Sequence, residues 1–264
     1  MADTPRTVSW VDTHAHLTHA KFAGKADEAI RNALDANVVK VISAATCADD
    51  ARAVVELARQ SPVVRAAVGV HPNDTHLVQP GDWEAITALA ADPTVVAIGE
   101  TGLDRYWKDA PLEVQQESFR NHLRLAEEQG LPVVIHCREA MEAIIDLLRY
   151  WGRPVRGTLH CFIGTLDDAK RLMDLGLHLG IGGISTFANK DFDALRETIR
   201  QLPAERLLVE TDAPFLSPHP YRGKTNEPAR VAVVGEALAA VRGWSVEECA
   251  AVTTAYAEAL FRRI

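Results

Sequence analysis

Two histidines separated by a single residue, His14 and His16, stand in the stretch VDTHAHL at residues 11–17. The apolar residues before them predict a strand, in which side chains at positions i and i+2 point to the same side. The two imidazoles therefore project together. Histidine is the commonest metal ligand in proteins, so the pair predicts half of a metal-binding site.

Further acidic and histidine side chains stand where other apolar, β-branched runs end. The side chains in these positions are His71, Glu100, His136, His160 and Asp212. Without His71, the whole set holds four histidines and two carboxylates. That exceeds the roughly three protein ligands of a catalytic zinc. It matches two ions about 3.5–4 Å apart that share a carboxylate, hold a hydroxide and stabilise charge on the attacking and leaving oxygens.

The elements that must position these side chains alternate along the chain. Strands are predicted at 8–12, 38–43, 63–69, 94–100, 132–136, 156–160, 177–182 and 206–210. Helices are predicted at 25–36, 49–60, 82–91, 112–129, 139–150, 166–175, 190–201, 228–242 and 246–262, the last with a capping box of Ser245 and Glu248. This pattern predicts a single-domain α/β fold over residues 1–264, a (β/α)8 TIM barrel, with a doubly wound open sheet as the alternative.

Barrel closure bears directly on the proposed site. Barrel enzymes build their sites at the C-terminal ends of the strands, where six of the eight predicted strands deliver a histidine or carboxylate. Closing a barrel makes the first and last strands neighbours, which would bring His14 and His16 to Asp212. An open sheet need not do so. Strands two and seven end without such a residue.

Composition limits the function classes. The 264 residues are 47% hydrophobic and 24% charged, as in a globular protein, and the net charge is −8. An acidic chain does not offer the broad basic face of a protein that wraps nucleic acid, although it can bind one or two phosphates through metal ions. Four cysteines without a CxxC pair indicate a reduced, cytoplasmic protein. No segment predicts a signal peptide, a membrane span or an obligate protein partner, and residues 1–7 are expected to form a loose tail.

Taken together, the motifs resemble those of the TatD-type metal-dependent deoxyribonucleases of the amidohydrolase superfamily. The matching segments are DTHAHL (12–17), VGVHP (68–72), GETGLD (99–104), VIHCR (134–138), HCFIG (160–164) and ETDAP (210–214). They occur in the family's order and cover nearly the whole chain. The resemblance is incomplete at Thr18 and His19, where the family often has an acidic residue.

The resemblance implies a role for each ligand-type residue. His14, His16 and Asp212 would hold one ion, His136 and His160 would hold the other, and Glu100 would bridge them. Asp212 would also accept a proton from the attacking water as general base. Imidazole-rich positions favour zinc or manganese over magnesium, which prefers oxygen ligands, but the resemblance also implies activity with magnesium in many members.

Substrate contacts are expected from four further residues. His71 and Arg138 would face the substrate phosphate, for which an arginine fork is suited, and Asp104 and Tyr106 would line the same pocket. Simpler roles remain open: His71 and Pro72 could shape a turn, and Arg138 could pair with Glu139.

Other candidate residues are expected to have ordinary roles. These residues are His19, His76, His122 and His178, together with Cys137 and Cys161, whose side chains should turn outward into the helix layer. The segment LSPHPYRGK (216–224) is either a surface connector or a lid whose Arg222 or Lys224 meets phosphates.

Three functions are consistent with these residues. The first is a deoxyribonuclease that uses a water activated by two metal ions to trim DNA single strands or strand ends in a 3'-5' exonuclease-like manner. The second is a metal-dependent ester or amide hydrolase such as a D-aminoacyl-tRNA deacylase. The third is a barrel without activity that binds a partner, which leaves the intact ligand set without a purpose.

Overall fold

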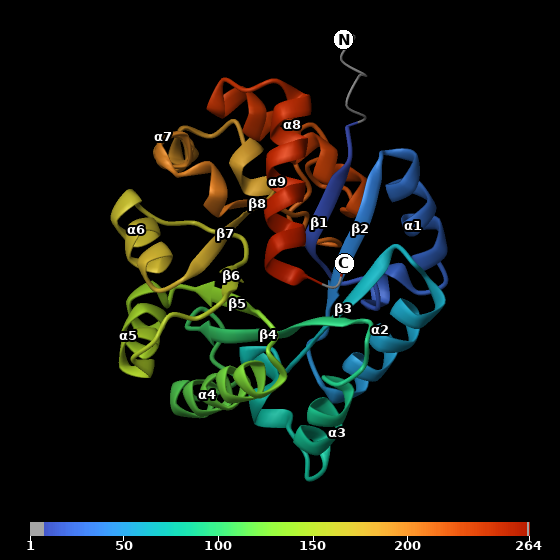
Figure 1. Ribbon diagram of the computed structural model, residues 1–264, viewed down its shortest axis with the longest axis vertical. Coiled ribbons are helices and arrows are strands. Elements are labelled where there is room, and N and C mark those ends of the chain that lie inside the picture. Colours follow the sequence, from blue (N-terminus) through green and yellow to red (C-terminus); the bar gives the residue numbers. More distant parts are fainter. Residues whose placement is uncertain (1–7, 263) are drawn as a thin grey trace.

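The computed structural model describes residues 8–262 and 264, so the expected tail at residues 1–7 lies outside the described part. Within it, parallel strands pair in sequence order around one sheet (Figure 1). The strands are β1 (Trp10–Ala15), β2 (Val38–Ala44), β3 (Val64–Val68), β4 (Val95–Asp104), β5 (Val133–Arg138), β6 (Gly157–Leu159), β7 (Leu177–Ile181) and β8 (Leu207–Val209). Each predicted strand is confirmed to within a few residues.

The first and last strands meet through the residues that follow them. Ala15 forms a parallel bridge with Ala213. The backbone N–H of His16 donates to the carbonyl of Ala213 at 2.7 Å, and that of Asp212 donates to the carbonyl of His14 at 2.9 Å. The sheet is therefore closed into a TIM barrel. The alternative of an open doubly wound sheet is wrong.

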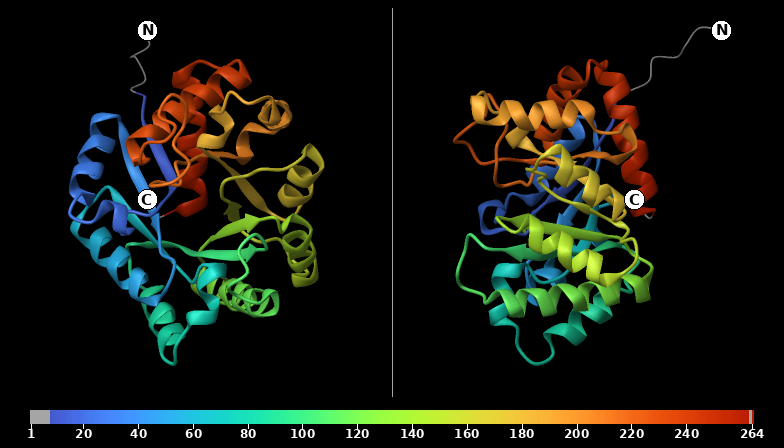
Figure 2. Two further views of the ribbon diagram at one scale, coloured as in Figure 1. Left: turned by 180° about the vertical axis from the view of Figure 1, so that it is seen from behind. Right: turned by 90° about the vertical axis from the view of Figure 1, so that its left-hand side faces the viewer.

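Helices surround the strands in all views (Figures 1 and 2). The α-helices are α1 (Ala26–Asp35), α2 (Ala48–Gln60), α3 (Asp82–Leu89), α4 (Leu112–Gln129), α5 (Met141–Trp151), α6 (Leu166–Asp174), α7 (Asp193–Gln201), α8 (Val231–Arg242) and α9 (Val246–Phe261). Short 3-10 helices are η1 (Ala20–Phe22), η2 (Pro72–Leu77), η3 (Gly183–Thr186), η4 (Lys190–Phe192), η5 (Ala204–Arg206) and η6 (Pro228–Arg230). The Ser245 hydroxyl accepts from the Glu248 N–H and caps α9, which is one of the two hydrogen bonds of the predicted capping box. None of the helices in the described part is both long and apolar enough to cross a membrane.

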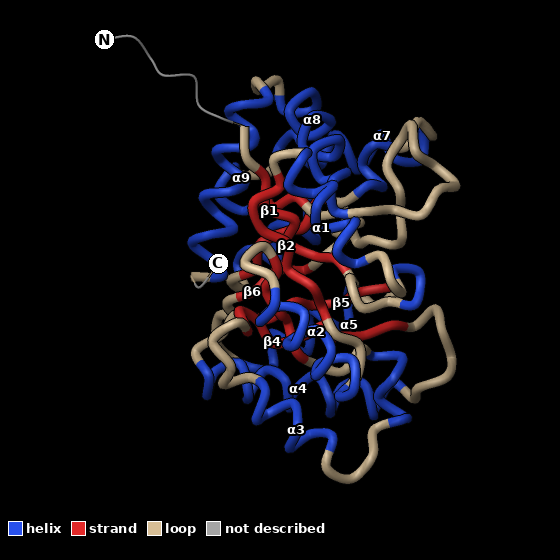
Figure 3. The backbone as a smooth tube through the Cα atoms, turned by 90° about the vertical axis from the view of Figure 1, so that its right-hand side faces the viewer, coloured by secondary structure: helices blue, strands red, loops and turns tan. Residues whose placement is uncertain are grey.

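One end of the barrel is filled by α9. Leu260 and Phe261, near the end of this helix, form a buried apolar cluster with barrel residues that include Val11, Ile42 and Val134. In Figure 3, α9 and the C-terminus lie on one side of the strands and long loops lie on the other. A packed interior at the α9 side leaves the C-terminal ends of the strands as the side on which a cavity can open.

Candidate active site

Glu100 is the centre of a cluster formed by the strand-end histidines. Its Oε1 lies 2.7 Å from Nδ1 of His136 and 2.8 Å from Nε2 of His160. Its Oε2 lies 3.3 Å from Nε2 of both His14 and His16. One carboxylate thus presents a different oxygen to each pair of imidazoles.

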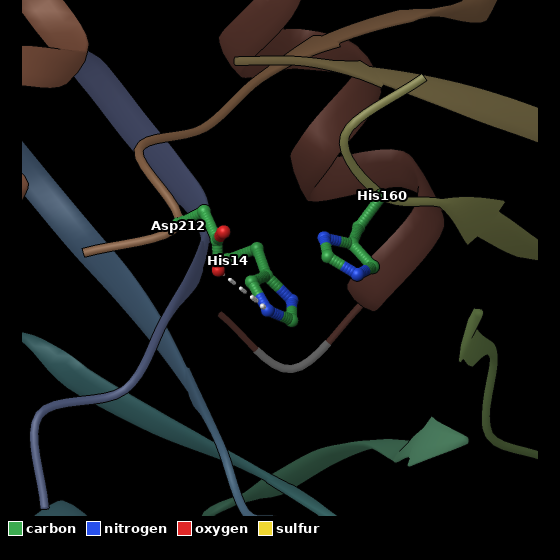
Figure 4. Close-up of side chains that lie close together, drawn as sticks. All are labelled: His14, His160 and Asp212. Carbon is green, nitrogen blue, oxygen red and sulfur yellow. Dashed lines mark ion pairs between the residues drawn. The ribbon is translucent and has the colours of Figure 1, made fainter. Parts of the chain in front are cut away.

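Asp212 completes the cluster from the segment that follows β8. Its Oδ1 lies 3.6 Å from Nε2 of His14 and 3.5 Å from Nε2 of His16. Figure 4 shows Asp212 beside His14, with the ring of His160 on the other side of His14. The His14 and His160 rings are stacked, with 4.0 Å between the ring centres and an angle of 14° between the ring planes. The structure therefore brings together all six side chains that the sequence singles out as metal ligands.

The cluster has the properties of a metal site. Nε2 of His14 and Nε2 of His16 lie 3.1 Å apart, and two facing imidazole nitrogens need a proton or a cation between them. The Glu100 Oε2 is buried and has no hydrogen-bond partner among the described residues. Three overlapping groups place their ligand atoms within 4.8 Å of one another, and their members are His14/His160/Asp212, His14/His16/Glu100 and His71/Glu100/His136. The donors of the first two groups fit divalent ions, and the third group contains His71, which the sequence assigns to substrate contact.

Hydrogen bonds outside the cluster select which ring nitrogen faces it. Nδ1 of His16 lies 2.9 Å from the carbonyl of Ala44, and Nε2 of His136 lies 3.0 Å from Oδ2 of Asp104. Both partners are acceptors, so these nitrogens carry a proton, and the opposite nitrogen of each ring is the one that can offer a lone pair to a metal ion once its own proton is lost. Such support of a ligand histidine by an acceptor is common around protein-bound metals.

His71 has the opposite arrangement. The backbone N–H of Asn73 donates to its Nδ1 at 3.2 Å, and this contact caps η2. Burial lowers the pKa of His71 to about 3, so the ring is neutral and its one proton lies on Nε2, which faces Glu100 at 3.6 Å. An N–H is a donor and not a metal ligand. His71 therefore both shapes the turn and presents a hydrogen-bond donor to the site.

Comparison with known proteins identifies the family. The sequence model described as "TatD related DNase" matches residues 11–262. The chain belongs to the TatD-related DNase family. It is 38% identical to the uncharacterized metal-dependent hydrolase YabD of Bacillus subtilis, over 95% of this chain and 98% of that protein. It is 36% identical to the protein named 3'-5' ssDNA/RNA exonuclease TatD of Escherichia coli, over 95% and 98% of the two chains.

A solved structure agrees with this assignment. The crystal structure of YJJV, a TatD homologue from Escherichia coli K12, matches with a TM-score of 0.89 and 31% identity, over 96% of this chain and 98% of that chain. The family and the fold expected from the sequence are confirmed, and the chain is a metal-dependent hydrolase of the TatD family.

The electrostatics of this TatD-family site keep the two key carboxylates ionised. Burial alone would raise the pKa of Glu100, but the facing histidines, His160 first, hold it well below its ordinary value. Burial would also raise the pKa of Asp212, but the hydrogen bond with His16 and the charges of His14 and His160 together lower it. In return, Asp212 and Glu100 overcome the burial of His16 and raise its pKa to about 9. The cluster is thus negatively charged at its carboxylates, as cation binding requires.

The site opens into a cavity of about 730 Å³. Arg138 and Asp104 line it, as the sequence predicts. Tyr106, which the sequence predicts to line the same pocket, is not among its lining residues; it lies under Arg138, whose Cζ is 3.7 Å from the centre of the Tyr106 ring. Asp104 is buried, and its Oδ1 accepts from the backbone N–H groups of Tyr106 and Trp107 at 2.9 and 3.1 Å. Asp104 therefore holds the loop after β4 and the His136 ring in place.

Several lining residues are not identified from the sequence. The cavity is lined also by Asn73, His19, Trp107 and Phe215. The sequence predicts an ordinary role for His19 and none for the other three. Fully buried Glu210 lies behind His160, with Oε1 3.7 Å from its Nδ1. Two signals point to Glu210: it is a charged residue at the end of an apolar run, and it precedes Asp212 by two residues.

Two further expectations need correction. Cys161 does not turn outward, because its φ of +48° breaks the strand alternation after His160, and the residue lines the cavity. Cys137 packs against the core but also reaches the cavity edge. Burial raises the pKa of both thiols, to about 11 for Cys137, which disfavours the nucleophilic thiolate form at neutral pH.

The segment 216–224 does not present its cations to the site. Arg222 lies over the ring of Phe187, 3.7 Å from its centre, and Lys224 lies 5.9 Å from the centre of Tyr221. Only the beginning of this connection reaches the cavity, through Phe215 and Leu216. The contacts favour a connector over a lid.

Proposed function

We propose that this protein hydrolyses phosphodiester bonds in DNA, trimming single strands or strand ends in the 3'-5' direction with two divalent metal ions. The observation that carries the proposal is Glu100, which offers one oxygen to each of two imidazole pairs. The 36% identity to a protein named 3'-5' ssDNA/RNA exonuclease supports the substrate and the polarity.

Each proposed ion has its own set of ligands. His14, His16 and Asp212 would hold one ion, His136 and His160 would hold the other, and Glu100 would bridge them. When bound, the two ions would provide a nucleophilic water near neutral pH and stabilise charge on the phosphate oxygens. The nitrogen-rich donors favour zinc or manganese, with magnesium as the third candidate.

The residues of the chain then have distinct tasks. Asp212 is ionised and lines the cavity, so it can accept the proton of the attacking water. The Nε2–H of His71 would donate a hydrogen bond to a phosphate oxygen. Arg138 at the cavity wall would bind the phosphate with its guanidinium fork. These two donors position the phosphodiester so that its phosphorus faces the cluster of ligands.

The test compares two substrates with one protein. The protein is stripped of metal with a chelator, reloaded with zinc, manganese or magnesium, and incubated with an end-labelled single-stranded oligonucleotide and with a D-aminoacyl-tRNA. We expect stepwise shortening of the oligonucleotide from its 3' end and no deacylation. Deacylation without shortening would replace the proposal with the ester hydrolase alternative.

Variants connect the activity to the site. Asp212→Asn should lower kcat by at least about 100-fold, the size of a lost general base. Asp146→Asn, a matched change at an exposed position on α5, should leave the rate unchanged. Near wild-type hydrolysis by Asp212→Asn would overturn the assigned role. The assignment of residues 1–264 to one domain and the cytoplasmic location stay predictions.

A further inference from the structure

Two exposed aromatic surfaces lie at the mouth of the cavity. The first, the β4 wall, consists of Tyr106, Trp107 and Arg138. Tyr106 and Trp107 are 46% and 50% exposed, and their rings meet edge to face at 5.1 Å. Arg138 is exposed and lies over the ring of Tyr106, so its guanidinium has a planar face available to a second flat group.

The second surface, the β8 wall, consists of Phe215, His19 and Lys21. Phe215 is 40% exposed and contacts the His19 ring edge to face at 5.1 Å. Lys21 Nζ lies 5.3 Å from the centre of the Phe215 ring. Each wall therefore combines an exposed aromatic ring with a cation, although the chain as a whole carries a net charge of −8.

The walls stand on opposite sides of the metal ligands. In the strand order of the closed barrel, three strands separate β4 from β8 in either direction. Trp107 and Phe215 line the same cavity, and so do Glu100, His136 and Asp212. The β8 wall contacts the ligand His16, whose ring lies 6.1 Å from that of Phe215. The β4 wall is connected to the ligand His136 through Asp104, which accepts from both.

We propose that the two walls are stacking sites for unpaired nucleobases, one on each side of the scissile phosphate. The proposal rests on the proposed phosphodiesterase function and names the part of the substrate that the mouth recognises. Aromatic and guanidinium faces stack on any base, because every base has a π-face. Lys21 beside Phe215 would meet a flanking phosphate, while the guanidinium edge of Arg138 would keep its contact with the scissile phosphate.

This arrangement makes a specific demand on the substrate. Two neighbouring bases in a duplex stack on each other and pair with the opposite strand, so they cannot lie against walls on opposite sides of a cavity. A single strand, or the frayed end of a duplex, can spread its last two bases apart. The walls thus select for unpaired nucleotides without reading base identity.

The experiment pairs a side-chain deletion with a base deletion. Hydrolysis of a short oligothymidylate is compared with hydrolysis of the same strand carrying abasic residues at the last two positions of both ends. With the intact strand, Trp107→Ala and Phe215→Ala should each raise KM about tenfold with kcat nearly unchanged, because stacking contributes equally to ground and transition states. With the abasic strand, neither variant should raise KM further. Trp107→Phe should restore most of the affinity.

Tyr150→Ala is the matched control, because Tyr150 is an 87% exposed aromatic near the end of α5 and outside the cavity lining. Binding of the same strands to the metal-loaded protein is followed in parallel by fluorescence anisotropy. Cleavage that is insensitive to both wall variants would overturn the stacking sites and leave the proposed function intact. Binding that depends on the walls without any cleavage would support the walls and overturn the function. Neither binding nor cleavage would overturn both.

Discussion

A glycine in β7 leaves the room that a buried carboxylate behind the site requires. A Cβ atom on Gly180 would lie 2.1 Å from Oε2 of Glu210. Glu210 accepts a hydrogen bond from the backbone N–H of Cys161, and its Oε1 lies 3.7 Å from Nδ1 of His160. Glu100 first and then Glu210 overcome the effect of burial and raise the pKa of His160 well above its ordinary value. The charge of Glu210 thus favours a proton on Nδ1 of His160, the nitrogen opposite the Nε2 that faces Glu100.

The prediction is that Gly180→Ala weakens metal binding although the residue contacts no proposed ligand. The new methyl group displaces Glu210, and loss of a partner behind a ligand histidine typically lowers metal affinity about 10- to 100-fold, which is about 1.4 to 2.7 kcal/mol. The overlap also lowers the free energy of unfolding by about 1–3 kcal/mol, as for other overpacked cores. Glu210→Gln should weaken metal binding to a similar extent, because the amide keeps the shape and loses the charge.

Gly182→Ala is a matched control on the same connection. Its Cβ would lie 3.7 Å from Glu210, an ordinary contact distance, so metal affinity should match the wild type. Affinities are measured by competition with a chromophoric chelator, and stability is measured by denaturant unfolding of the metal-free proteins. The reasoning is refuted if Gly180→Ala and Glu210→Gln both bind metal within about twofold of the wild type, well inside the expected loss.

Three further predictions concern protons and packing. Because the pKa of His16 is about 9, metal uptake at neutral pH should release protons, and the affinity for metal should rise as the pH is raised toward 9. Calorimetry in buffers of different ionisation enthalpy would detect the released protons, and equal heats in all buffers would contradict this prediction. Burial raises the pKa of Asp12 well above its ordinary value of 3.8. The metal-free wild type should therefore lose stability as the pH rises from about 3.8 through the raised pKa of the folded protein, whereas Asp12→Asn should show a flatter pH profile in denaturant unfolding. Gly235→Ala places a Cβ 2.2 Å from the ring of Trp10 and should cost about 1–3 kcal/mol of unfolding free energy, with metal affinity unchanged in the chelator assay.

The sequence by itself determines the strands, most of the helices and the proposed ligands. Each strand is a short apolar run, and in a parallel barrel its C-terminal end can only lie at one mouth, so a histidine or carboxylate at that position is directed to the site. This is why His14, Glu100 and His160 can be grouped from residues far apart in the chain. The helix predicted at 190–201 begins as the 3-10 helix η4 and becomes α7 only at Asp193, a detail that apolar spacing does not encode.

Only the tertiary structure decides which side chains support and surround that group. Periodicity reports burial, but a contact such as Glu210 with His160, or the pairing of Phe215 with His19, joins segments whose separation depends on barrel closure and loop conformation. Gly180 in β7 leaves room for the carboxylate of Glu210, the residue that follows β8. Cys161 faces the cavity because one backbone angle departs from the extended form. These features arise from packing between distant residues, which no local pattern records.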